Sequence, residues 1–117
     1  MIIERSLTCK NSSKNQFLEE FSIYLLSKDC ENIEKNVSDE VIIRRVGKKD
    51  EKYWEYLPDD LEKIQVLTSI SHGKYGSCHG KLWTNQKSYA FSIQYEFVST
   101  SKKIIQEAMV FLIEELK

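Results

Sequence analysis

The chain of 117 residues lacks the sequence features that mark export, membrane insertion or a disulfide framework. Its three cysteines, Cys9, Cys30 and Cys78, are odd in number and form no CxxC pair, which argues against paired disulfides and a zinc knuckle. Glu4 and Arg5 interrupt the start of the chain after two isoleucines, so no secretory signal is expected. No apolar run approaches the roughly 20 residues that cross a bilayer. We therefore expect a cytoplasmic protein with reduced thiols.

Linker-forming residues are also scarce, since the chain has four glycines, one proline and no Pro/Gly/Ser-rich stretch. Opposite charges nearly cancel, with 17 basic and 18 acidic residues, so no global field favours nucleic acid or an anionic membrane as a partner. The hydrophobic content of 41% suffices for one core without disulfides or metals. These properties predict a single α+β domain over residues 1–117.

The first third of the sequence predicts one strand followed by one helix. Apolar and polar residues alternate over residues 3–9, which is typical of a half-buried strand. Ser13 and Gln16 have the spacing of a capping box, and large apolar residues then recur at helical spacing over residues 14–28. The polar stretch 29–40 either extends this helix or forms a loop, because propensity does not decide between the two.

The middle of the sequence predicts three strands, over residues 41–46, 52–57 and 64–70. Gly47 lies between the first two segments, so we expect them to form a hairpin with a five-residue connection. Pro58 ends the second arm because proline cannot donate a hydrogen bond to a sheet.

The most regular strand pattern lies near the carboxyl end. Five large residues alternate with polar ones and therefore share one face of a strand: Tyr89, Phe91, Ile93, Tyr95 and Phe97. Residues 81–84 fit a further short strand. A closing helix is predicted by a wide apolar stripe at helical spacing, made by Ile104, Ile105, Ala108, Met109, Leu112, Ile113 and Leu116.

This order of elements, β-α-β-β-β-β-α, predicts an α+β two-layer sandwich. Consecutive strands without intervening helices favour a mainly antiparallel sheet. Both amphipathic helices must bury their apolar stripes, so we expect two helices packed on the one face that carries the aromatic residues. Removal of the Phe91 side chain should then cost about 3 to 5 kcal/mol.

The stretch 71–83 contains both histidines and three of the four glycines. His72, Cys78 and His79 are candidate zinc ligands, but their spacing is poor because two are adjacent and the third lies six residues earlier. Adjacent residues of an extended chain point to opposite sides, so Cys78 and His79 do not readily form a nucleophile-base pair. We expect a mobile connection without catalytic residues, metal or cofactor.

Charge is unevenly distributed along the chain. Residues 29–62 hold 11 acidic and 6 basic residues, a net charge of −5, whereas residues 72–103 hold five lysines and one glutamate, a net charge of +4. Aromatic rings rimmed by carboxylates have the composition of an interface hot spot. We therefore expect one set of residues in the acidic segment to bind a partner: Tyr53, Trp54, Glu55, Tyr56, Asp59 and Asp60.

Together these patterns predict a non-enzymatic protein-binding module, and in its specific form a small cytosolic inhibitor of a partner protein such as a basic toxin domain. Size and element order resemble those of small immunity proteins, although no shared motif carries this analogy. Two alternatives stay open. One is a helix-grip-like domain that encloses a small apolar ligand, and the other is a Cys/His-dependent enzyme or metal site in the stretch 71–83.

Overall fold

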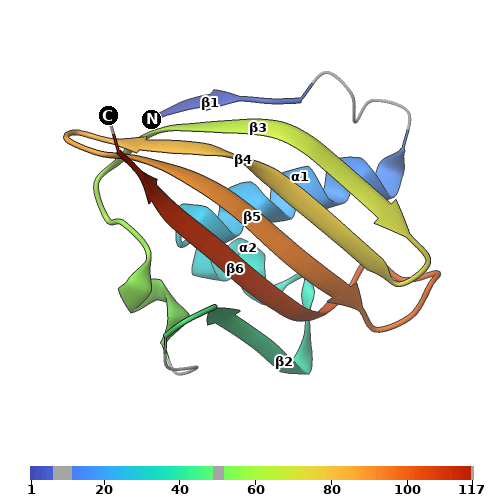
Figure 1. Ribbon diagram of the computed structural model, residues 1–117. Coiled ribbons are helices and arrows are strands. Elements are labelled where there is room, and N and C mark those ends of the chain that lie inside the picture. Colours follow the sequence, from blue (N-terminus) through green and yellow to red (C-terminus); the bar gives the residue numbers. More distant parts are fainter. Residues whose placement is uncertain (7–11, 49–51, 117) are drawn as a thin grey trace.

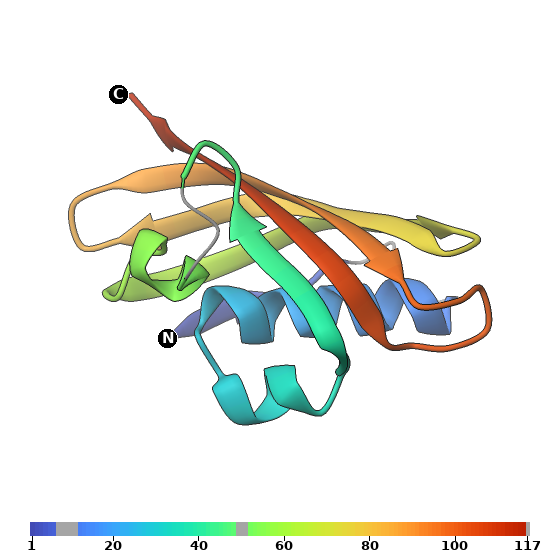
Figure 2. The same cartoon turned by 90° about the horizontal axis from the view of Figure 1, so that it is seen from below.

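The computed structural model describes residues 1–6, 12–48 and 52–116, which form a curved six-stranded sheet with helices on one side (Figures 1 and 2). The α+β fold class predicted from the sequence is confirmed. The elements are β1 (Ile2–Glu4), α1 (Ser13–Leu26), α2 (Cys30–Glu34), β2 (Val37–Arg45), the 3-10 helix η1 (Tyr53–Tyr56), β3 (Leu61–His72), β4 (Tyr75–Thr84), β5 (Ser88–Phe97) and β6 (Ile105–Glu115).

The sheet is antiparallel at its centre and parallel at its edges. Its strand order is β1-β3-β4-β5-β6-β2. Strands β3 to β6 form an antiparallel meander, while β1 pairs with β3 and β2 pairs with β6 in parallel. The prediction of a mainly antiparallel sheet is therefore confirmed. The two parallel pairings at its edges were not predicted.

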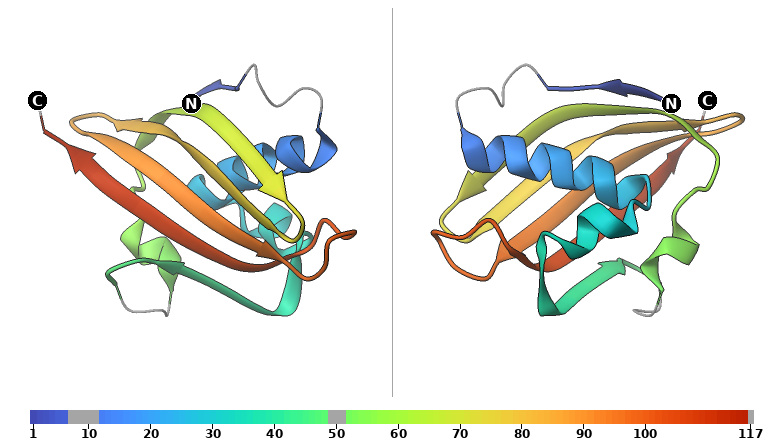
Figure 3. Two further views of the ribbon diagram at one scale, coloured as in Figure 1. Left: turned by 45° about the vertical axis from the view of Figure 1, so that its right-hand side comes forward. Right: turned by 180° about the vertical axis from the view of Figure 1, so that it is seen from behind.

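Helix α1 confirms the predicted helix and covers the concave side of the sheet (Figure 3). Its cap is Ser12 rather than Ser13, because Ser12 has an extended backbone and its side chain accepts a hydrogen bond of 3.2 Å from the backbone N–H of Asn15. Lys28 has a left-handed φ of 60° and separates α1 from the short helix α2. No helix within the described residues is long and apolar enough to span a membrane.

The predicted aromatic strand is confirmed as β5, and its apolar face forms the centre of the core. Phe91, Ile93, Tyr95 and Phe97 are at most 3% exposed. The ring of Tyr95 meets the ring of Phe21 from α1 edge-on, with their centroids 5.7 Å apart. The apolar stripe of α1 thus packs on the face that the alternation of β5 predicted.

The predicted closing helix is wrong, because its residues form the strand β6. β6 has apolar residues on both faces: Val110 and Leu112 are buried beneath the helices, while Phe111 and Ile113 are exposed on the other side. Apolar residues on both faces of a strand also recur at helical spacing, so the sequence pattern fits either structure. Backbone pairing with β5 and β2 on its two sides selects the strand. The second helix on the sheet is α2 instead.

The predicted hairpin over residues 41–57 is also wrong. β2 pairs with β6, and the segment after it forms η1 instead of a second strand. Lys52 has a left-handed φ of 55°, which an extended strand does not accommodate. The alternation of large residues around Trp54 therefore does not describe the two faces of a sheet.

The stretch 71–83 is not a mobile connection, because it forms the end of β3, a tight turn and most of β4. Gly73 lies in the turn with a left-handed φ of 61°. The strand predicted at 81–84 is the end of β4 and is thus longer than expected. At the amino end, β1 covers only the start of the predicted strand 3–9, whose residues 7–9 lie outside the described residues.

Candidate functional site

The structure separates the imidazole and thiol groups of the stretch 71–83. Cys78 is fully buried on the side of β4 that faces α1, while its neighbour His79 is exposed on the opposite side. His72 lies at the end of β3 and is also exposed. Within the described ranges, no three His, Cys, Asp or Glu side chains form a group that would hold a metal ion. Cys78 and His79 therefore lack the mutual contact that nucleophilic catalysis requires.

The interior beneath α1 contains a buried pair of hydroxyl groups. Ser22 donates a hydrogen bond of 2.7 Å to the carbonyl oxygen of Leu18, and its Oγ lies 2.6 Å from the hydroxyl oxygen of Tyr95. Burial raises the pKa of Tyr95 well above its ordinary value. The rings of Phe21 and Phe97 fill the space beside this pair. Aromatic side chains thus occupy the face on which a helix-grip protein would enclose an apolar ligand.

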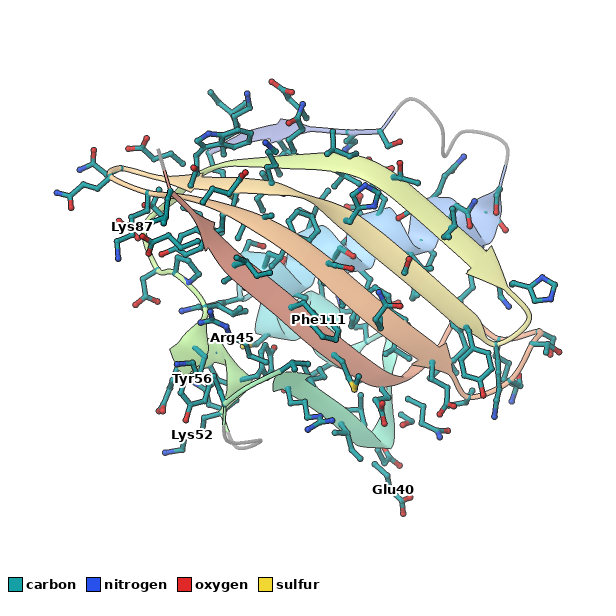
Figure 4. All side chains as sticks on the ribbon, in the orientation of Figure 1. Glu40, Arg45, Lys52, Tyr56, Lys87 and Phe111 are labelled. Carbon is teal, nitrogen blue, oxygen red and sulfur yellow. The ribbon has the colours of Figure 1, made fainter. Side chains whose placement is uncertain are left out.

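Four of the predicted partner-binding residues, Tyr53 to Tyr56, form η1 beside β2 (Figure 4), whereas Asp59 and Asp60 lie on the connection from η1 to β3. Arg45 fixes η1 in place, because its guanidinium donates hydrogen bonds of 2.7 Å to the carbonyl oxygen of Tyr56 and 3.0 Å to that of Leu112. The same arginine thus joins η1 to β6. We call the set Tyr53, Trp54, Glu55, Tyr56, Asp59 and Asp60 the η1 surface.

The two aromatic rings at the start of the η1 surface have different environments. Tyr53 packs against the core, and its burial, followed by the nearby charge of Cys30, raises its pKa to about 12. Trp54 is 45% exposed and meets the Tyr53 ring edge-on, with the centroids 5.5 Å apart. The half-buried tyrosine therefore supports an exposed tryptophan.

Lysines partly neutralise the η1 surface. Asp59 forms an ion pair with Lys28 of the turn after α1, and Glu55 lies 4.0 Å from Lys52. The local charge is therefore less negative than the sequence of this segment indicates. Asp60 is exposed in the same turn as Asp59.

The sequence did not predict a second surface, the side of the sheet that faces away from the helices, which we call the outer face. Figure 1 shows that neither helix crosses it. Large apolar side chains on it are 36 to 67% exposed: Ile42, Leu67, Ile70, Tyr75, Phe111 and Ile113. The sequence did not reveal this surface because its pattern predicted a helix for residues 104–116. Residues of a helix would not lie in the sheet and so could not share its outer face with β3 and β4.

No protein-family model matches the chain, and no curated protein sequence matches it. A de novo designed protein with a curved β-sheet has 16% sequence identity and a TM-score of 0.67, over 88% of this chain and 87% of that one. A de novo designed protein of the NTF2 fold has 15% identity and a TM-score of 0.56, over 83% and 82% of the two chains. These similarities define the fold as a curved sheet of the type found in NTF2-fold designs, and they carry no information about function.

Proposed function

We propose that the protein is a non-catalytic binding module that recognises a partner protein through the η1 surface. The observation that carries this proposal is the placement of Trp54, which is 45% exposed yet supported by the Tyr53 ring. A large ring that is already held in one position buries much area on binding and loses little side-chain entropy. Trp54 is therefore the expected anchor of the interface.

The charges around Trp54 favour a partner with a basic surface. Glu55, Asp59 and Asp60 are exposed on the same segment of chain, and Asp59 leaves 91% of its side chain accessible although it is paired with Lys28. Carboxylates at the rim of an interface steer a positively charged partner and suppress acidic ones. Inhibition of a basic toxin domain in the cytoplasm is the specific form of this proposal.

Affinity capture with the wild-type chain and the double variant W54A/D60K tests the proposal. The wild-type chain should retain one partner in stoichiometric amount, and the double variant should bind it at least about 30-fold more weakly, as expected for loss of a hot-spot side chain. Asp59 is left unchanged because it pairs with Lys28. The matched control is Tyr75→Ala, which removes an exposed ring from the β3–β4 hairpin.

Two results would contradict this function. Unchanged capture by W54A/D60K would show that the η1 surface is not the binding site. Enzymatic turnover that is abolished by Cys78→Ser or His72→Ala would instead support the Cys/His-dependent alternative.

A further inference from the structure

The outer face carries an apolar ridge on β6. Phe111 and Ile113 are two residues apart on this strand, so both point outward, and they are 36% and 67% exposed. Figure 4 shows Phe111 on the side of the sheet that is turned away from the helices. Side chains of this size are normally buried in a stable monomer when they are adjacent.

A hollow lies directly beside this ridge. In the sheet register, Phe111 pairs with Ser92 and Ile113 pairs with Ala90, so the strand next to the ridge presents only small side chains. The hollow has a volume of about 480 Å³, and its far wall is formed by Leu67 of β3 and by residues 79–81 of β4. Leu67 is pushed outward at an irregularity of the β3–β4 pairing between Val66 and Thr68. The ridge on β6 and the hollow over β5 and β4 therefore lie side by side on the outer face.

We propose that the outer face binds a second copy of this chain and forms a two-fold symmetric dimer. A two-fold axis that runs along β5 in the interface plane places β6 of each copy over β4 of the other. Phe111 of one copy then enters the hollow above Ser92 of its partner, and the reverse contact forms at the same time. Two sheets that pack face to face lie about 10 Å apart, which is the space that such interdigitating side chains fill.

Charged side chains surround the apolar ridge on the outer face. The outward charged residues of β6 are Glu107 and Glu115, whereas β4 presents Lys81 and His79. Within one chain, Lys81 Nζ lies 3.5 Å from a carboxylate oxygen of Glu115. In the dimer each Glu115 lies over Trp83 of the other copy, two residues along β4 from Lys81. The outward Glu96 of β5 lies near the axis in both copies, and in each chain Lys74 Nζ lies 3.9 Å from its carboxylate.

The exposed apolar area is comparable with the apolar part of a standard interface. With exposures of 36 to 67%, the apolar side chains of the outer face leave on the order of 500 Å² accessible to water. A standard interface buries about 800 Å² per partner, of which somewhat more than half is apolar. The polar side chains between the ridge and β3, such as Gln94 and Ser77, supply the remainder. The 3-10 helix η1, which carries Trp54, lies beside β2 and stays free for another partner.

Sedimentation equilibrium of the full chain tests the dimer. The wild-type protein should have about twice the chain mass of 13.8 kDa. Phe111→Glu removes the ridge, and Ser92→Arg fills the hollow, so each single variant should raise the dissociation constant at least about 30-fold and sediment as a monomer. Both positions are on the uncovered face, and unchanged circular dichroism spectra would show that each variant is folded. Ala90→Arg replaces Ser92→Arg if the latter does not fold.

Mixing the Phe111→Glu and Ser92→Arg variants makes the test specific for this geometry. In a mixed dimer, the introduced carboxylate of one chain meets the introduced guanidinium of the other, while the second contact retains the native Phe111 and Ser92. Equimolar mixing should therefore restore a dimer that neither variant forms alone. The control variant Trp54→Ala should leave the dimer mass unchanged, which separates this interface from the η1 surface.

Three outcomes would overturn the proposal. The first is a wild-type chain that sediments as a monomer at its highest soluble concentration, in which case the outer face binds another molecule or none. The second is a dimer that persists in both single variants, and the third is a failure of the mixture to restore the dimer when each variant is folded and monomeric.

Discussion

The hydroxyl oxygens of Tyr95 on β5 and Ser22 on α1 lie 2.6 Å apart in the buried layer between the helix and the sheet. Because the Ser22 hydroxyl donates to the carbonyl oxygen of Leu18, the Tyr95 hydroxyl is the donor in this pair. Both residues are at most 3% exposed. The contact therefore fixes the position of α1 along β5 and satisfies the only polar atom of the Tyr95 side chain.

Substitution of Tyr95 and substitution of Ser22 should lower the free energy of unfolding by different amounts. Tyr95→Phe removes the buried donor completely, so the free energy of unfolding should fall by about 1 kcal/mol. Ser22→Ala leaves the Tyr95 hydroxyl buried without its acceptor and should cost more, about 1 to 3 kcal/mol. Urea unfolding of both single variants and the double variant measures the coupling. Additive effects of the two substitutions would contradict a direct hydrogen bond.

Alkaline pH should destabilise the protein through its buried tyrosines. Burial raises the pKa of Tyr95 well above the ordinary value of 10.0 and that of Tyr53 to about 12. Above about pH 10 the unfolded chain therefore releases protons that the folded chain retains. The free energy of unfolding should decrease as pH rises through this range. Below about pH 10 these tyrosines should have no effect on it. Tyr95→Phe should make this decrease shallower in urea titrations, whereas Tyr75→Phe, which alters an exposed ring, should not. If the free energy of unfolding fell equally steeply with pH in Tyr95→Phe and in the wild type, the raised pKa of Tyr95 would be contradicted.

Gly80 tests whether the stretch 71–83 is a strand. A Cβ atom at this position would lie 1.9 Å from the carbonyl oxygen of Gln65 and 2.9 Å from the Phe91 ring. Gly80→Ala should therefore force the β3–β4 pairing apart and destabilise the fold by about 2 to 3 kcal/mol. In a mobile loop the same substitution would be neutral or slightly stabilising. Thermal unfolding measures the difference, with the exposed Ser101→Ala as the control.

The two described cysteines should differ strongly in their reactivity. Cys30 is exposed at the start of α2, whereas Cys78 is fully buried on β4. In a Cys9→Ser background, iodoacetamide should alkylate Cys30 in the native protein and reach Cys78 only as fast as the chain unfolds. Mass spectrometry of the peptides reports the two rates. Rapid labelling of Cys78 in native buffer would show that the thiol lies in an accessible site after all.

Sequence periodicity predicted the elements whose two faces differ in polarity. In β5 the inner residues are aromatic or aliphatic and the outer ones are mostly polar, and α1 has one apolar stripe, so each segment fits a single period. β6 carries apolar residues on both faces, and its helix-forming residues, such as Ala108 and Met109, favoured the wrong period. Its structure depends on pairing with β5 and β2, a tertiary contact that local periodicity does not contain.

For the candidate sites, too, the sequence predicted local geometry but not tertiary contacts. The opposite directions of Cys78 and His79 followed from the geometry of an extended chain, and the structure places them on opposite faces of β4. Assignment of the η1 residues to a strand predicted that their rings lie on the two faces of a sheet, whereas the structure packs the rings of Tyr53 and Trp54 against each other. The ridge of Phe111 and Ile113 could not be found, because its existence depends on the identity of β6 as a strand.

Residues 105–115 form a strand between β5 and β2, and this placement leaves the apolar outer face uncovered. Nuclear Overhauser contacts of the labelled protein test it most directly. We predict cross-strand contacts between Ser92 and Phe111 and between Ile93 and Val110, as in the paired register. Contacts between residues three and four positions apart throughout this segment, with no contacts to β5, would show a helix and contradict this placement.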